Sequence, residues 1–100
     1  FTEPYCPEMR AQLLDAAGST GVEVIASGTY GASQGPRLET AAEIDRMERD
    51  GCHMVGMTGM PETALARELG LCYAVIAVSA NAAAGRGAAR RDGDLRHLRR

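Results

Sequence analysis

Three polar residues of this sequence stand where an α/β protein places its ligand contacts. Glu39 directly precedes a predicted helix, Thr58 follows a short apolar run, and Asn81 closes a longer one. Ligands of α/β folds bind at the ends of strands, so we expect these side chains to belong to one site. A carboxylate only accepts hydrogen bonds, an amide donates and accepts, and a hydroxyl does either. Each of the three segments therefore brings a polar group to a position that is typical of a ligand contact.

Apolar runs of strand length supply the framework for these residues. Residues 21–27 alternate as in a strand, and residues 52–57 and 71–80 are short apolar runs, of which the last is apolar along nearly its whole length, as in a strand covered on both faces. Helical patterns separate the runs, and such an alternation is typical of parallel connections. The expected fold is α/β, as part of a three-layer α/β sandwich with a mixed or parallel sheet.

Terminal residues mark the helices. The first is predicted to begin at Pro7 and to end at Gly18, because proline suits the first helical turn and glycine the end. The second begins at Thr40, since Thr40 and Glu43 have the spacing of a capping box. The third begins at Pro61. A site residue directly before Thr40 is therefore held in place by the start of a helix.

A glycine-rich stretch, residues 28–35, follows the first apolar run. Gly28, Gly31 and Gly35 interrupt it, with Tyr30 between them. A phosphate-binding loop ends in Lys-Ser or Lys-Thr and leads directly into a helix, and this stretch does neither. We interpret it as a loop that approaches the ligand.

Composition bounds the class of protein. The 100 residues allow one small domain, and 45% hydrophobic with 24% charged residues is an ordinary balance for a soluble globular protein. No apolar run approaches the roughly 18–20 residues that cross a bilayer, and the first ten residues lack the pattern of a signal peptide. We expect a cytoplasmic protein without a membrane partner.

Charge is distributed unevenly along the chain. Residues 1–85 carry eleven acidic residues against five arginines, whereas residues 86–100 carry six arginines and two aspartates. A basic tail can bind nucleic acid, but this one has neither aromatic residues nor a repeat. We interpret residues 86–100 as a solvated, disordered tail, with nucleic-acid binding as the weaker alternative.

The cysteines and histidines do not form a recognisable site. Cys6, Cys52 and Cys72 are an odd number without a close pair, which suggests neither a disulfide framework nor a metal site. Cys52 and Cys72 lie in apolar runs, so we expect buried thiols. His53 is interpreted as a partly exposed structural residue, and no metal is expected.

Three segments in order resemble the nucleoside phosphorylase family, in particular its trimeric purine nucleoside and methylthioadenosine or methylthioinosine phosphorylases. They are residues 34–40 (QGPRLET), 56–62 (GMTGMPE) and 71–81 (LCYAVIAVSAN). The first two are most similar to the bacterial S-methyl-5′-thioinosine phosphorylases. The resemblance implies that residues 1–85 are the C-terminal part of such a domain, that the N-terminal half is missing, and that residues 86–100 diverge.

The resemblance also implies a purine site. Asn81 corresponds to the residue that donates to O6 and accepts from N7 of the base, and is the catalytic candidate. Glu39 corresponds to the acid that accepts N1–H of a 6-oxopurine, which makes it the specificity residue. Leu38 supplies an apolar wall in place of an aromatic side chain. Ala82 and Ala83 follow Asn81 beside the base, where adenine-preferring relatives have a second carboxylate.

The implied reaction is phosphorolysis, in which phosphate attacks C1′ of a purine nucleoside and releases the base. Met57 corresponds to the ribose contact and Thr58 to the phosphate contact. Arg37 is not used as a phosphate ligand in the family, so we expect it to be structural or at a subunit contact. Inorganic phosphate is the co-substrate and no cofactor is implied. The family further implies purine salvage and a homotrimer.

One other interpretation of the function remains open at this point. Residues of the family's phosphate site that lie upstream do not occur in this sequence, so we expect the 100 residues alone to be inactive. The alternative function is therefore a catalytically inactive fragment that retains only a purine-binding surface.

Overall fold

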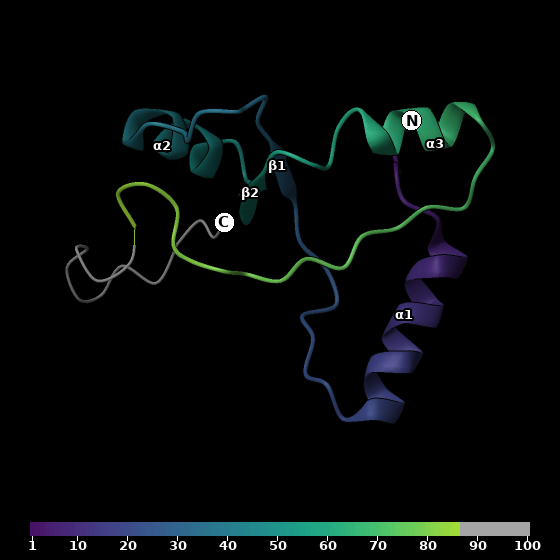
Figure 1. Ribbon diagram of the computed structural model, residues 1–100. Helices are drawn as coiled ribbons and strands as arrows, with labels where there is room; N and C mark the ends of the chain where they lie inside the picture. Colours follow the sequence, from purple (N-terminus) through teal and green to yellow (C-terminus); the bar gives the residue numbers. More distant parts are fainter. Residues whose placement is uncertain (87–100) are drawn as a thin grey trace. The chain divides into compact units, whose positions relative to one another are not determined.

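The computed structural model describes residues 1–86 of the chain. The described part contains α1 (Pro7–Thr20), β1 (Tyr30–Ala32), α2 (Ala41–Arg49), β2 (Met54–Gly56) and α3 (Glu62–Glu68) (Figure 1). The chain divides into two compact units. The first unit is Phe1–Ser27 with Thr58–Ala77, and the second comprises, among the described residues, Gly28–Met57 and residues 78–86.

Helix α1 of the first unit begins as predicted and ends later than predicted. Pro7 occupies the first turn, where its missing N–H costs nothing. Gly18, the predicted end, lies inside the helix, and Gly21 terminates it with φ 75° and with its N–H directed at the carbonyls of Ala17 and Gly18. A glycine inside a helix is tolerated, whereas the left-handed conformation ends it.

A disulfide joins the two segments of the first unit. Cys6 and Cys72 are bonded, with 5.1 Å between their Cα atoms, and the N–H of Cys6 donates to the carbonyl of Tyr73 at 2.8 Å. The prediction of no disulfide was therefore wrong, as was that of a buried thiol at Cys72. The two cysteines are 66 residues apart, and spacing alone does not reveal which cysteines the fold brings together.

Two of the three predicted strands do not form in the described residues. Residues 21–27 and 71–80 lack the hydrogen-bond ladder of a strand, and Ile76 and Val78 are 64% and 86% exposed. An apolar run becomes a strand only where a neighbouring strand pairs with it. No helix among residues 1–86 is long and apolar enough to cross a bilayer.

The second unit contains a small parallel sheet. β1 and β2 pair in the register Tyr30 with Met54, Gly31 with Val55 and Ala32 with Gly56. β2 lies within the predicted run 52–57. β1 lies within the stretch 28–35, which we had interpreted as a loop, so that interpretation was wrong for Tyr30–Ala32.

Helix α2 packs with this sheet around a common core. The buried members of that core are Ile44, Met47, Val55 and Ala83. Ile44 and Met47 lie three residues apart on one face of α2, and Val55 is the central residue of β2. Since Ala83 joins the same core, the segment that follows residue 80 is held against α2 and β2.

Candidate functional site

A cavity of about 190 Å³ lies within the second unit. Its lining consists of Leu38, Glu39, Asn81, Ala82, Ala83 and Ala84. The first two residues directly precede α2, and the other four form the segment that follows the last apolar run. The structure thus brings together every residue that the sequence suggested as a purine contact, although the two segments are far apart in the chain.

Glu39 is the buried acid of this cavity. Its residue is only 7% exposed, and its carboxylate Oε2 accepts a hydrogen bond from the hydroxyl of Ser33. A buried charge needs partners, because its desolvation is otherwise costly. Ser33 directly follows β1, so the strand that sequence reasoning missed carries the residue that contacts the acid.

The start of α2 orders the backbone next to Glu39. Thr40 caps the helix: its Oγ1 accepts from the N–H of Glu43 at 3.1 Å, while the Thr40 N–H donates to Glu43 Oε1 at 2.9 Å. The predicted capping box is confirmed. Because both backbone groups of the cap are satisfied locally, the backbone on either side of Thr40 has a defined direction.

Arg37 reinforces the same cap. Its guanidinium donates to both carboxylate oxygens of Glu43, at 2.8 and 3.1 Å. The hydrogen bonds from Arg37 and from the backbone and side chain of Thr40 lower the pKa of Glu43 to about 2. Arg37 therefore has a structural role in this unit, which was one of our two predictions for this residue.

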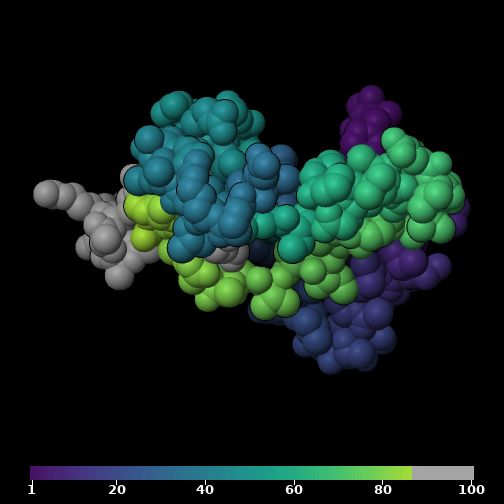
Figure 2. All heavy atoms as spheres, turned by 45° about the horizontal axis from the view of Figure 1, so that its top comes forward, coloured from purple at the N-terminus to yellow at the C-terminus, as the bar shows by residue number. Residues whose placement is uncertain are grey.

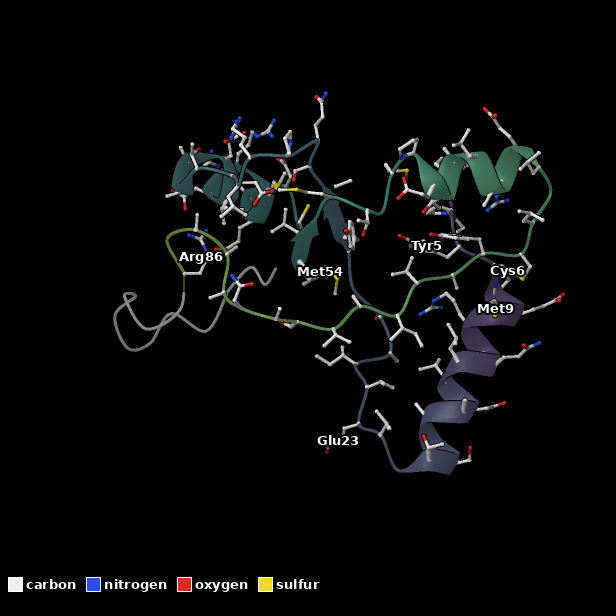
Figure 3. The ribbon with its side chains drawn as sticks, in the orientation of Figure 1. Tyr5, Cys6, Met9, Glu23, Met54 and Arg86 are labelled. Atoms are coloured by element: carbon white, nitrogen blue, oxygen red, sulfur yellow. A yellow bond between two sulfur atoms is a disulfide. The ribbon has the colours of Figure 1, made fainter. Side chains whose placement is uncertain are left out.

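Arg86 anchors the other wall of the cavity. Its side chain is 2% exposed, and it forms ion pairs with Asp45 and Glu48 of α2, both at 3.0 Å. In Figure 3 the side chain of Arg86 points toward α2, and in Figure 2 the yellow-green atoms at the end of the described chain lie against that helix. We had counted Arg86 with a solvated tail, and that prediction was wrong for this residue. The rest of the predicted tail, residues 87–100, lies outside the described residues.

The amide of Asn81 lines the cavity at its exposed side. Its Nδ2 donates to the carbonyl of Ala82 at 2.9 Å. Leu38 is also largely exposed, whereas Ala83 is buried. The lining of the cavity therefore combines a buried acid, an accessible amide and apolar groups.

The two remaining predicted contacts are placed differently. Met57 is half-buried in the second unit and packs beside Gly35: a Cβ on Gly35 would lie 2.6 Å from Met57 Sδ. Gly35 also has φ +67°, so its backbone favours glycine. Thr58 is exposed and belongs to the first unit. Neither Met57 nor Thr58 lines the cavity.

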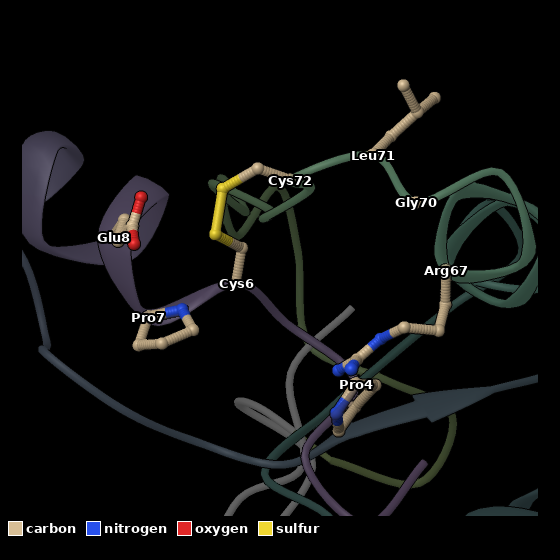
Figure 4. Close-up of a pocket in the computed structure, with 8 residues that line it drawn as sticks. All are labelled: Pro4, Cys6, Pro7, Glu8, Arg67, Gly70, Leu71 and Cys72. Carbon is tan, nitrogen blue, oxygen red and sulfur yellow. A yellow bond between two sulfur atoms is a disulfide. The ribbon is translucent and has the colours of Figure 1, made fainter.

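A second cavity, of about 390 Å³, lies in the first unit beside the disulfide (Figure 4). Arg67 is the cation in its wall, but the guanidinium already donates to the carbonyl of Glu3 and lies 6.0 Å from the centroid of the Phe1 ring. Within residues 1–86, no group of three or more metal-binding side chains gathers.

Sequence reasoning missed Ser33, Ala84 and Arg86. Ser33 had a usable signal, since a hydroxyl at the carboxyl end of a strand is a common ligand-side position in parallel sheets. The signal was hidden because the glycines around it suggested a loop. His53, expected to be structural, accepts from the N–H of Thr29 at 2.9 Å through Nδ1.

Comparison with known proteins adds a family to this geometry. The phosphorylase superfamily pattern matches residues 1–98. A probable S-methyl-5′-thioinosine phosphorylase of Xanthomonas campestris pv. campestris is 63% identical over 87% of the chain and 35% of its own length. The 6-oxopurine nucleoside phosphorylase of Pyrococcus furiosus is 53% identical over 85% of the chain and 32% of its own length. The chain thus spans about a third of the length of these curated relatives.

Proposed function

The chain belongs to the phosphorylase superfamily, and from this premise we propose that it forms the base-reading part of a phosphorylase acting on 6-oxopurine nucleosides. The observation that carries the proposal is that Glu39 and Asn81 line the same cavity. A carboxylate and an amide on one cavity suit a base with N1–H, O6 and N7. The names of the relatives from Xanthomonas and Pyrococcus support the same class of substrate.

Glu39 selects the base in this proposal. Its carboxylate accepts the N1–H of hypoxanthine or guanine, whereas adenine presents a lone pair at N1. Leaving a buried polar group without a partner costs about 1–3 kcal/mol, so the site disfavours adenine at this one contact by roughly 10- to 100-fold.

Asn81 stabilises the leaving base. As phosphate attacks C1′ and the bond to N9 breaks, negative charge develops on the purine. The amide then donates to O6, and its oxygen accepts from a protonated N7. In this role Nδ2 exchanges its bond to the Ala82 carbonyl for one to the base, which the exposure of Asn81 permits.

The size of the cavity supports a role in binding the base alone. Pockets for whole drug-sized ligands measure about 300–1,000 Å³. At about 190 Å³, the cavity suits a base-sized group, and the sugar and phosphate require other residues. We propose Met57 for the ribose and Thr58 for phosphate, which acts as co-substrate without any cofactor.

Finer parts of the proposal follow from the relatives and the family. The nucleoside is S-methyl-5′-thioinosine, in line with the name of the Xanthomonas relative. The enzyme is a homotrimer that serves purine salvage in the cytoplasm. Because the cytoplasm keeps most thiols reduced, this location predicts that Cys6 and Cys72 bond only after oxidation.

A chimera tests the proposed activity. The matched 87 residues of the Xanthomonas relative are replaced by those of this chain, and hypoxanthine release from S-methyl-5′-thioinosine is measured with and without phosphate. We expect phosphate-dependent release that Glu39→Gln lowers about 10- to 100-fold. Glu23→Gln, at an exposed acid, is the matched control and leaves the rate unchanged. A folded chimera that releases adenine as fast as hypoxanthine would refute the assignment.

Purine binding without turnover is the second candidate. It is favoured by the fact that the cavity is lined by residues of the second unit alone, whereas Thr58 belongs to the first. The 100-residue chain by itself, titrated with hypoxanthine in a calorimeter, distinguishes the two. Binding without phosphate-dependent release, together with an inactive chimera, would favour this candidate over the enzyme.

A further inference from the structure

Ser33 and Glu39 meet across the turn that joins β1 to α2. The Ser33 hydroxyl donates to Glu39 Oε2, and both residues lie within the second unit. This hydrogen bond links the acid of the cavity to the residue that directly follows β1. The proposed function has so far used only the acid.

The sheet holds Ser33 in place. Its N–H donates to the carbonyl of Gly56 at 2.8 Å, which extends the pairing of β1 with β2 by one residue. The residue is half-buried, so its hydroxyl has limited access to water. Ser33 is thus a fixed donor and not a mobile loop residue.

Glu39 needs such a donor to define its direction. The capping box orders the backbone at Thr40, but a glutamate side chain has three further torsions that the backbone leaves open. Hydrogen bonding to the charged form stabilises a buried carboxylate and fixes its plane. A group that must accept N1–H of a base has to point the same way in every molecule.

We propose that Ser33 is the positioning residue for base specificity: its hydroxyl holds the Glu39 carboxylate in the orientation that accepts N1–H of a 6-oxopurine. This inference rests on the proposed function. A carboxylate has about four lone-pair sites, so it accepts from Ser33 and from the base together. Glu39 discriminates between the bases, and Ser33 fixes the orientation of the Glu39 carboxylate.

A pair of isosteric variants isolates the hydroxyl. Ser33→Thr keeps it, whereas Ser33→Val has the same shape without it. In the chimera with the Xanthomonas relative, we expect Ser33→Val to lower kcat/KM for S-methyl-5′-thioinosine about 10- to 100-fold and Ser33→Thr to retain most of it. Ser27→Val, at an exposed serine, is the matched control.

A second substrate distinguishes a positioning role of Ser33 from a role in stability alone. S-methyl-5′-thioadenosine lacks N1–H, so its kcat/KM should not fall in Ser33→Val, and the preference for the 6-oxopurine shrinks by the same factor. A general loss of structure would lower both substrates equally. In a Glu39→Gln background, Ser33→Val should add little, because both changes remove one interaction. Equal losses on both substrates, or full additivity, would overturn the inference.

A direct measurement tests the Ser33–Glu39 contact independently of the proposed activity. The side-chain carboxyl carbon of Glu39 is followed by NMR in the wild type, Ser33→Thr and Ser33→Val. We expect the valine variant alone to shift and broaden the signal. If the chimera proves inactive while the signal responds, the proposed function fails and the Ser33–Glu39 link stands. A signal that is identical in all three proteins would overturn the link itself.

Discussion

The guanidinium of Arg86 lies 3.0 Å from the carboxylate of Glu48, although 38 residues separate them in the sequence. A second carboxylate, that of Asp45, pairs with the same guanidinium at 3.0 Å. The two acids lie one turn apart on α2 and are partly exposed, whereas the arginine is buried. The segment that closes the cavity is thereby tied to the helix that begins beside Glu39.

Removing this anchor should destabilise the protein. We expect Arg86→Met, which keeps much of the apolar stem, to lower the free energy of unfolding by about 1–3 kcal/mol, because charge-assisted hydrogen bonds are lost. The partners remain hydrated, so the larger cost of orphaned buried charges does not apply. Urea denaturation of the wild type and the variant measures the change in the free energy of unfolding. Arg46→Met, at an exposed arginine of α2, should change it by less than about 0.5 kcal/mol. Equal stability of the Arg86 and Arg46 variants would contradict the anchor.

Glu43 should titrate far below its usual range. With a pKa of about 2, against an ordinary value of 4.5, its ionised form is favoured by folding. Its contribution to stability is complete above pH 4.5 and is lost as the pH falls through about 2. NMR titration of the carboxyl carbon measures the pKa, and Arg37→Met should move it toward 4.5. Arg49→Met, at an exposed arginine of the same helix, should leave it in place. A titration near 4.5 in the wild type would count against the observed ion pair.

The Cys6–Cys72 bond should be detectable and stabilising. Under oxidising conditions we expect alkylation of Cys52 alone after denaturation, and of all three cysteines after reduction. A disulfide typically stabilises a protein by about 2–4 kcal/mol, and the Cys6–Cys72 bond spans 66 residues, so under oxidising conditions Cys6→Ser should lower the unfolding free energy by that amount. Cys52→Ser leaves the bond intact and serves as the control. Three modified thiols without a reductant would show that the bond does not form.

Gly35 should be sensitive for two separable reasons. Gly35→Ala places a Cβ at φ +67°, which costs about 1–2 kcal/mol, and brings it 2.6 Å from Met57 Sδ. In a Met57→Ala background only the backbone cost remains, so the substitution should cost less there. A double-mutant cycle of thermal unfolding measures the difference. The same cost in both backgrounds would mean that Met57 shifts freely aside.

Asn81 should set the second half of the base preference. Asn81→Asp replaces the donor to O6 with a group that only accepts, so release of hypoxanthine by the chimera should fall about 10- to 100-fold. Release of adenine should fall less, because a 6-amino group donates to a carboxylate. Ser79→Ala, at an exposed neighbour in the chain, provides the control. A larger loss for adenine than for hypoxanthine would contradict the role of the amide.

Local signals predicted the helices well. Pro7, the capping box of Thr40 with Glu43, and Pro61 each act through neighbours within one turn, so the three helices begin where the sequence placed them, within a residue. The end of α1 was misplaced because two glycines competed for it, and only backbone geometry decides which one turns left-handed.

The candidate contacts to the base were also readable before the fold. Glu39 and Asn81 stand at element ends, and the motifs around them resemble a family whose superfamily pattern matches the chain. Their side chains' roles remain predictions, but the structure places both on one cavity. Residue types and their positions along the chain were sufficient to select these two candidates, because hydrogen-bonding capacity is a property of the side chain itself.

Only the tertiary structure determined which segments of the chain pair with one another. Tyr30–Ala32 became a strand because β2 lies beside it, while two more apolar runs of the described chain found no such neighbour. The bonds of Cys6 to Cys72, Ser33 to Glu39 and Arg86 to α2 likewise join segments that no local pattern relates. A ladder, a disulfide or an ion pair depends on the partner's position, and that position follows from how the whole chain packs.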